Sequence, residues 1–174
     1  MRIIVGFAAG GLTDIIARLI GQQLSDRLGR QFIVENRPGA GTNVATEAVA
    51  NARPDGYTFL LATSSNAINA TLYEKLNFSF VRDLDPVGSI ADAPHIMEVN
   101  ALFPARTVSD FITYAKANSG KINFASAGIG SSSHVTGELF KMMAGVNMIH
   151  VPYRGSSPAI TDVIGGQVQV TFDP

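Results

Sequence analysis

The sequence predicts an α/β fold in which parallel or mixed sheets are flanked by helices. Short apolar segments of strand length alternate with longer segments whose apolar residues recur every three or four positions. Turn signals rich in Gly and Pro separate these segments. An irregular stretch over residues 81–104 interrupts the alternation, so we predict a first unit over residues 1–92 and a second over residues 93–174.

In the first unit, residues 3–7 predict a buried strand and residues 12–28 the helix that follows it. Gly29 stands where a left-handed helix cap is expected. The apolar positions of this helix predict its buried face: Leu12, Ile15, Ile16, Leu19, Ile20, Leu24 and Leu28. Further strands are expected at residues 32–35 and 57–62, and further helices at residues 43–51 and near 67–74.

The second unit begins within an irregular region, because Pro86, Gly88 and Pro94 break residues 84–97. Thr107 followed by Asp110 resembles a capping box and predicts a helix that ends near Asn118. The expected remainder is strands at 122–125, 148–151 and 167–172, and helices at 132–144 and 156–164. Hinge motion is expected at the crossovers near residues 90–100.

Composition excludes several classes of function. Only 16 % of the 174 residues are charged, against about 25 % in an average protein, and the net charge is −1. That balance removes the electrostatic case for nucleic acid or an anionic membrane as a partner. The absence of Cys excludes disulfides, thiolate zinc sites and a Cys nucleophile. The longest apolar run, over residues 3–12, is too short to span a bilayer.

Two small-residue loops, each between a strand and a helix, are the most informative feature. The first contains Phe7, Ala8, Ala9, Gly10 and Gly11, and the second contains Ser126, Gly128, Gly130, Ser131 and Ser132. Helix N-termini carry unpaired N–H groups and positive dipole ends, and small side chains let a ligand approach the backbone. We expect each loop to bind one end of an anionic ligand; tight turns without a ligand are the alternative.

Several side chains near these loops are further candidates, each with a structural alternative. Asp14 either complements the helix dipole or orders water and loop amides at the ligand. His134 either contacts the anion or caps the surface. Ser64 and Asn66 follow the third strand and are expected to face the ligand. Tyr153 opens another strand-to-helix loop, in which Arg154 is either a carboxylate ligand or a surface cation.

Neither a metal site nor an active site is evident. His95, His134 and His150 lie on different segments, with no second ligand at metal spacing, and His150 is expected to be structural. No cofactor motif is present: Ser133 stands where the third glycine of a dinucleotide loop belongs, and no Lys follows either glycine run. A serine hydrolase lacks its nucleophile motif and an orienting acid, so no enzyme is expected.

In chain order, a series of motifs resembles the receptors of tripartite tricarboxylate transporters, also called Bug solute-binding proteins. These motifs are Gly10-Gly11-x-x-Asp14, residues 34–41, residues 54–58, the Gly-x-Gly-Ser-x-x-His stretch at 128–134, residues 151–155 and Phe172-Asp173. The resemblance covers essentially the whole chain. It implies a type II periplasmic-binding-protein-like fold with two lobes, in which the loops and Asp173 contribute to ligand binding.

The resemblance also implies a function and a location. We expect a periplasmic receptor that captures a small mono- or dicarboxylate, an organic acid or acidic amino acid, and is a monomer when full length. Its partners would be the membrane subunits of the transporter. Family members carry a signal peptide and continue past Asp173, so the second lobe is expected to be truncated. The alternatives are a ligand sensor for a signalling system and, less favoured, a Ser-dependent α/β hydrolase.

Overall fold

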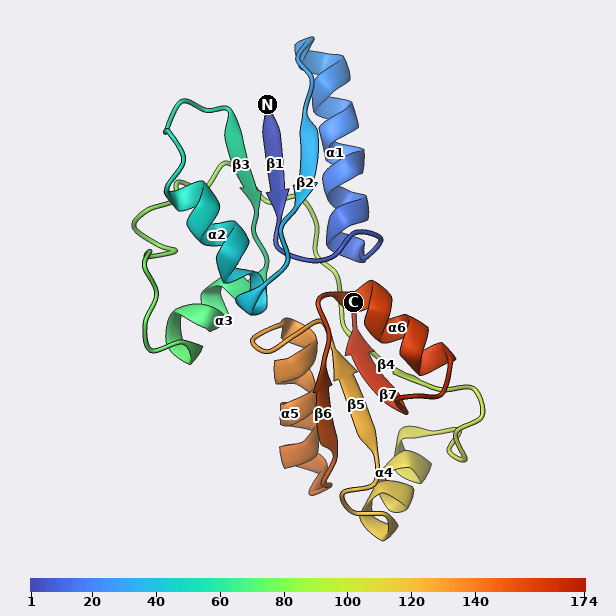
Figure 1. Cartoon of the computed structure of the whole chain (residues 1–174). Coiled ribbons are helices and arrows are strands. Elements are labelled where there is room, and N and C mark those ends of the chain that lie inside the picture. Colours follow the sequence, from blue (N-terminus) through green and yellow to red (C-terminus); the bar gives the residue numbers. More distant parts are fainter. The chain divides into compact units, whose positions relative to one another are not determined.

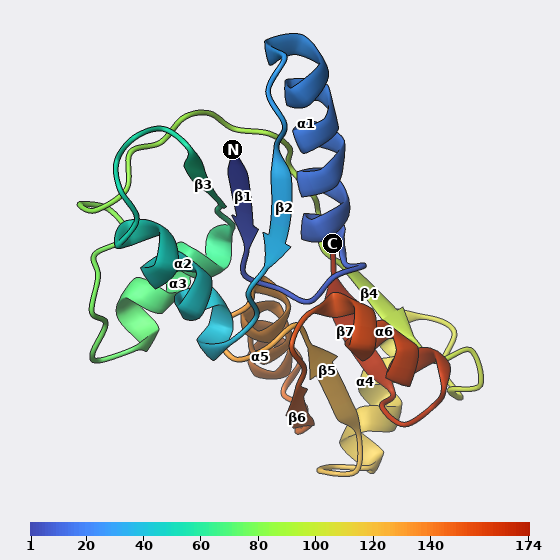
Figure 2. The same cartoon turned by 45° about the horizontal axis from the view of Figure 1, so that its top comes forward.

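The computed structural model describes all residues from Met1 to Pro174, which divide into two compact units, Met1–Asp92 and Ala93–Pro174 (Figures 1 and 2). Strands and helices alternate in both units, as the sequence predicts. The first unit contains β1 (Arg2–Val5), α1 (Leu12–Leu28), β2 (Ile33–Asn36), the 3₁₀ turn η1 (Ala40–Thr42), α2 (Asn43–Ala50), β3 (Thr58–Leu61) and α3 (Ser64–Leu72).

The sheet of the first unit is parallel, with strand order β2-β1-β3 (Figure 1). Side chains of the central strand alternate between two hydrophobic clusters. Ile3 and Val5 pack with Ala17 of α1, whereas Ile4 packs with Ala45 and Val49 of α2. Helices therefore cover both faces of this sheet, which is the usual arrangement for parallel strands.

The predicted boundaries of α1 and its left-handed cap at Gly29 are confirmed, but the predicted buried face is only partly right. Of the predicted positions, Ile20 packs against the core beside Ala17. The buried positions are Asp14, Ala17 and Gly21, whereas Ile15, Leu19 and Leu28 are exposed. A Cβ at Gly21 would come within 3.5 Å of Ile3, so the small residues allow α1 to approach the sheet closely. Periodicity predicted the helix but could not identify which side packs.

The second unit contains β4 (Ile96–Val99), α4 (Val108–Ala117), β5 (Asn123–Ser126), α5 (Ser132–Ala144), β6 (Ile149–Pro152), α6 (Ser156–Ile164) and β7 (Val170–Asp173). Its strand order is β4-β7-β5-β6. β5 runs parallel to both its neighbours, and β4 pairs antiparallel with β7. The prediction of a mainly parallel α/β sheet is confirmed, with β4 as the exception.

Two local predictions need correction. The start of β4 lies in a segment predicted to be irregular, because Pro86 and Pro94 hid a strand of four residues that alternation cannot detect. Helix α3 begins at Ser64 rather than near Ala67, because the hydroxyl of Thr63 and the side chain of Asn66 form a capping box. The capping box expected at Thr107 and Asp110 is present and starts α4.

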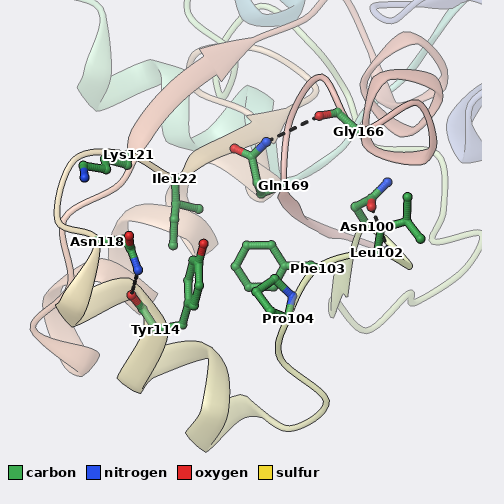
Figure 3. Close-up of a pocket in the computed structure, with 10 residues that line it drawn as sticks. All are labelled: Asn100, Leu102, Phe103, Pro104, Tyr114, Asn118, Lys121, Ile122, Gly166 and Gln169. Carbon is green, nitrogen blue, oxygen red and sulfur yellow. Dashed lines mark hydrogen bonds between the residues drawn. The ribbon is translucent and has the colours of Figure 1, made fainter.

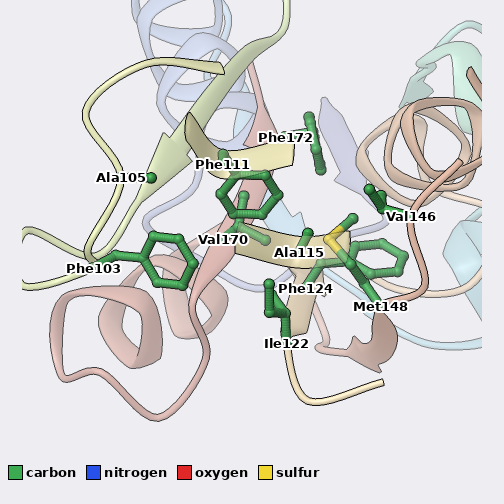
Figure 4. Close-up of a cluster of buried hydrophobic side chains, with 10 residues drawn as sticks. All are labelled: Phe103, Ala105, Phe111, Ala115, Ile122, Phe124, Val146, Met148, Val170 and Phe172. Atoms are coloured by element: carbon green, nitrogen blue, oxygen red, sulfur yellow. The ribbon is translucent and has the colours of Figure 1, made fainter. Parts of the chain in front are cut away.

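The larger core of the second unit lies on the face of the sheet covered by α4 and α5 (Figure 4). It contains Phe103, Ala105, Phe111, Ala115, Ile122, Phe124, Val146, Met148, Val170 and Phe172. Each fully buried large side chain contributes about 1.5–3 kcal/mol of hydrophobic stabilisation. A smaller cluster around Ala125 and Ala159 packs under α6, so this sheet too is covered on both faces. No helix is long and apolar enough to cross a membrane.

Candidate functional site

Loop 1, residues 7–11, runs from the carboxyl end of β1 to the N-terminus of α1. Gly11 caps the helix without a side-chain hydrogen bond, and the amides of Leu12 and Thr13 have no acceptor within the chain. Gly10 has a φ of 85°, a left-handed conformation that glycine adopts without strain. The structure therefore presents backbone N–H groups at the positive end of a 17-residue helix.

Asp14 organises loop 1 from the first turn of α1. Its carboxylate accepts the N–H of Gly10 at 2.9 Å and two hydrogen bonds from Arg18 at 2.9 and 3.0 Å. Burial acts to raise the pKa of Asp14, but the hydrogen bonds from Arg18 and Gly10 outweigh it and the pKa lies below its ordinary value. Of the two roles considered for Asp14, ordering of the loop amides is the one with direct contacts.

Asn66 and Ser64 lie at the carboxyl end of β3 but differ in accessibility. The amide of Asn66 is buried, accepts the N–H of Thr63 at 2.7 Å and donates to Thr42 and Thr46 at 3.2 and 2.8 Å. All these partners lie within the unit, so this side chain fixes the turn before α2. Ser64 is exposed at the first position of α3.

Loop 2, residues 126–132, joins β5 to α5, and its serines are bonded within the loop. The Ser126 hydroxyl accepts the N–H of Gly128 at 3.1 Å, and the Ser131 hydroxyl donates to the carbonyl of Gly128 at 2.6 Å. Ser131 also caps α5 by accepting the N–H of His134 at 3.2 Å. The amides of Ser132 and Ser133 have no acceptor within the chain. The hydroxyls therefore shape the loop, and free amides remain at the helix N-terminus.

Gly128 is required for the path of loop 2. Its φ is 130°, and a Cβ at this position would lie 2.9 Å from the carbonyl oxygen of Tyr153. The predicted benefit of glycine was close approach of a ligand; the structure shows close approach of the chain's own backbone after β6.

All three histidines contact loop 2. His150 Nε2 lies 2.6 Å from the Ser126 hydroxyl, His134 Nδ1 accepts the N–H of Gly130 at 3.3 Å, and His95 Nε2 lies 2.8 Å from the Ser132 hydroxyl. The three histidines lie on different elements, as predicted, and the fold brings their rings to the same loop. The β5–β6 register places His150 beside Phe124, and neither this register nor the position of His95 was indicated by the sequence.

Two of these imidazoles form a stack on a phenylalanine. The ring centroids of Phe124 and His150 are 4.7 Å apart, and those of His150 and His134 are 4.1 Å apart. Burial lowers the pKa of His150 to about 4, and the neighbouring His134 contributes to this shift. Burial also lowers the pKa of His134 below its ordinary value. Both imidazoles are therefore neutral at pH 7.

The remaining candidates lie around α6 and the carboxyl end of β7. The Tyr153 hydroxyl donates to Asp162 at 2.6 Å, and burial together with this acid raises the pKa of Tyr153 to about 12. Asp173 is buried, its Oδ2 atom has no hydrogen-bond partner, and burial raises its pKa. Arg154 is exposed. Asp173 ends a strand adjacent to the strand that leads into loop 2.

A separate cavity of about 360 Å³ is lined by Asn100, Leu102, Phe103, Pro104, Tyr114, Asn118, Lys121, Ile122, Gly166 and Gln169 (Figure 3). Ile122 and Gln169 directly precede β5 and β7, so the cavity lies at the amino ends of these strands, away from loop 2. Asn100 and Asn118 donate to backbone carbonyls. These amides support the local fold, and we assign no site here.

The chain contains no group of three or more His, Cys, Asp or Glu side chains placed to hold a metal ion. The Ser132 hydroxyl lies 2.8 Å from His95 Nε2, which is the distance of a nucleophile from its base.

A helix N-terminus with free backbone amides follows the carboxyl edge of each sheet, and this arrangement suits a small anion. Residues 16–173 match the family model of the tripartite tricarboxylate transporter family receptor. The chain belongs to this family, which confirms the resemblance. The family is one of receptors, not enzymes.

Two curated relatives illustrate the match. The chain is 37% identical over 170 residues to a UPF0065 protein in the tcbD-tcbE intergenic region of Pseudomonas sp. strain P51, covering 98% of this chain and 51% of that protein. It is 36% identical over 175 residues to protein BugT of Bordetella pertussis, covering 99% of this chain and 54% of BugT. The chain thus spans about half the length of the curated relatives it matches.

Solved structures agree. The chain is similar to periplasmic binding protein BugD, with a TM-score of 0.95 and 36% identity, over 99% of this chain and 58% of BugD. It is similar to Rpa4515 of R. palustris with adipate, with a TM-score of 0.96 and 37% identity, over 99% of this chain and 58% of Rpa4515. It is also similar to MatC of Rhodopseudomonas palustris with bound malate, with a TM-score of 0.90 and 33% identity, over 99% of this chain and 59% of MatC. These matches confirm the predicted periplasmic-binding-protein fold.

Proposed function

We propose that this chain is part of an extracytoplasmic receptor that captures a small mono- or dicarboxylate for a tripartite tricarboxylate-type transporter. The observation that carries the proposal is the N-terminus of α5. The hydroxyls of Ser126 and Ser131 are bonded within loop 2, so the amides of Ser132 and Ser133 are the groups left to bind a carboxylate. Loop 1 offers the equivalent amides at α1.

Other features support the same ligand class. The chain is sparsely charged, and a receptor that binds anions through backbone amides needs few cationic side chains. Two similar solved structures hold dicarboxylates, adipate and malate. A periplasmic location and membrane-subunit partners follow from the family and are part of the proposal. So is the assignment of the two units to two receptor lobes, residues 1–92 and 93–174.

A panel of organic acids and acidic amino acids that includes adipate and malate tests the proposal by thermal shift and calorimetry. At least one carboxylate should raise the melting temperature, and uncharged amides of matched size should not. Ser132→Pro removes one of the free amides at a position where proline suits a helix, and it should weaken binding. Val108→Pro at the equivalent first position of α4 is the control for folding. Failure of every acid in the panel would contradict the proposal.

A further inference from the structure

The sequence contains three histidines, and all three contact loop 2. They come from the segment before β4, from α5 and from β6, and they reach Ser132, Gly130 and Ser126 respectively. We propose that these histidines are positioning residues that hold loop 2 in its carboxylate-binding form through their contacts with Ser132, Gly130 and Ser126. The inference rests on the function proposed above and adds pH dependence to it.

One of these contacts requires a particular ring nitrogen to be unprotonated. The N–H of Gly130 donates to His134 Nδ1, so that nitrogen must carry a lone pair. Gly130 is buried, and without this acceptor its N–H would be left unsatisfied. At the start of the loop, the Ser126 hydroxyl is shared between His150 Nε2 and the N–H of Gly128. Two loop amides thus depend, directly or through Ser126, on an imidazole.

The stack disfavours protonation of both rings. The centroids of His134 and His150 are 4.1 Å apart, so two imidazolium ions would repel at this distance. Two charged groups of α5 also face the pair: Glu138 favours protonation and Lys141 opposes it. They form an ion pair with each other at 2.9 Å, and the Lys141 ammonium lies 5.5 Å from the Phe124 centroid. The acid that faces His95 is Asp173 of β7.

Acidification should therefore weaken carboxylate binding. Protonation of His134 Nδ1 replaces an acceptor with a donor directed at the Gly130 N–H, and the loop must rearrange. A cationic ring that did not position the loop would instead attract an anion. Loop positioning and simple charge attraction therefore predict opposite changes in carboxylate affinity on acidification. If the imidazoles only supplied charge, affinity would rise at low pH.

The test compares two replacements of each ring in the whole chain. His134→Asn keeps an acceptor near the position of Nδ1 and does not titrate, whereas His134→Leu removes the acceptor. His150→Gln and His150→Leu form the matched pair for Nε2. The ligand-free readout is the amide resonance of Gly130 followed through a pH titration. The binding readout is the affinity for malate and adipate at about pH 8 and about pH 5.5.

We expect the Gly130 resonance to titrate with His134 in the wild type and to be pH-independent in His134→Asn. At about pH 8, His134→Asn should bind within about twofold of the wild type, and His134→Leu about tenfold more weakly, the size of one lost hydrogen bond to a buried donor. The wild type should lose more affinity on acidification than His134→Asn.

Equal behaviour of the Asn and Leu variants, or a Gly130 resonance that ignores His134, would overturn the inference. So would a wild-type affinity that rises at low pH. If the wild type binds no probe at either pH, the proposed function fails, and the ligand-free resonances still decide whether the histidines position the loop.

Discussion

Loops 1 and 2 have the same position in their units but are held by different chemistry. Loop 1 is fixed by one buried carboxylate, Asp14, that binds Gly10 and Arg18. Loop 2 is fixed by neutral serine hydroxyls and imidazoles. Both arrangements leave amides free at a helix N-terminus, and they differ in what acid does to them. The pKa of His150 beside loop 2 is about 4, whereas the pKa of Asp14 lies below its ordinary value of 3.8.

The largest expected effect is on the backbone of loop 2. Gly128→Val should destabilise the second unit by roughly 2–4 kcal/mol, because valine is strained at a φ of 130° and its Cβ would meet the Tyr153 carbonyl. Chemical denaturation measures this change. Gly88→Val is the matched control, since a Cβ at Gly88 meets nothing within 4 Å. Equal stability of the two variants would contradict the expected clash between a Cβ at position 128 and the Tyr153 carbonyl.

The corresponding change in loop 1 should be smaller. Asp14→Ala removes the acceptor of the Gly10 N–H and one partner of a half-exposed Arg18, and we expect a loss of about 1–2 kcal/mol. Asp26→Ala, at an exposed position bonded only to Gln22, should cost less than about 0.5 kcal/mol. A loss at Asp14 no larger than that at Asp26 would remove the proposed role of the carboxylate.

The group beside loop 2 and the group in loop 1 should affect the free energy of unfolding in different pH ranges. The folded pKa of His150 is about 4, below its ordinary value of 6.5, so the unfolded chain binds more protons between these values. The free energy of unfolding should therefore fall as the pH drops from 6.5 towards 4, and His150→Gln should reduce this fall. Asp14, whose pKa is lowered, keeps its contribution above its ordinary value of 3.8 and loses it only at lower pH. Identical pH profiles for the wild type and His150→Gln would contradict this account.

The smallest effect is expected on the outer face of α1. Leu19 is 64% exposed, so Leu19→Gln should change stability by less than about 0.5 kcal/mol. Ala17→Leu, two residues earlier and on the buried face of the same helix, should cost about 1–3 kcal/mol through overpacking. If chemical denaturation shows that Leu19→Gln is more destabilising than Ala17→Leu, the leucine and isoleucine face predicted from the sequence would be supported instead.

Local signals in the sequence predicted most of the fold. The helix from Leu12 to Leu28, its Gly29 cap and the capping box at Thr107 depend on neighbouring residues, and all are present. The buried face of α1 was not predictable in the same way, because close packing of Ala17 and Gly21 is a tertiary effect. Strand β4 was missed since its four residues are defined by pairing with β7, which lies far along the chain.

In the candidate site, too, local features were predictable from the sequence and tertiary contacts were not. Both loops and the helices after them were predictable, because small residues before an amphipathic segment form a local pattern. The convergence of His95, His134 and His150 was not, since it depends on the β5–β6 register and on the position of β4. The sequence also could not show that Asn66 and Tyr153 direct their polar atoms to partners within their own units.

Amide resonances recorded during a titration with malate test the central claim most directly. We predict that the amides of Ser132 and Ser133 in loop 2, and of Leu12 and Thr13 in loop 1, show the largest shifts. Amides around the Asn100–Gln169 cavity should not move. Saturable shifts at that cavity, or binding that leaves both helix N-termini unperturbed, would contradict the claim that backbone amides in these loops bind the carboxylate.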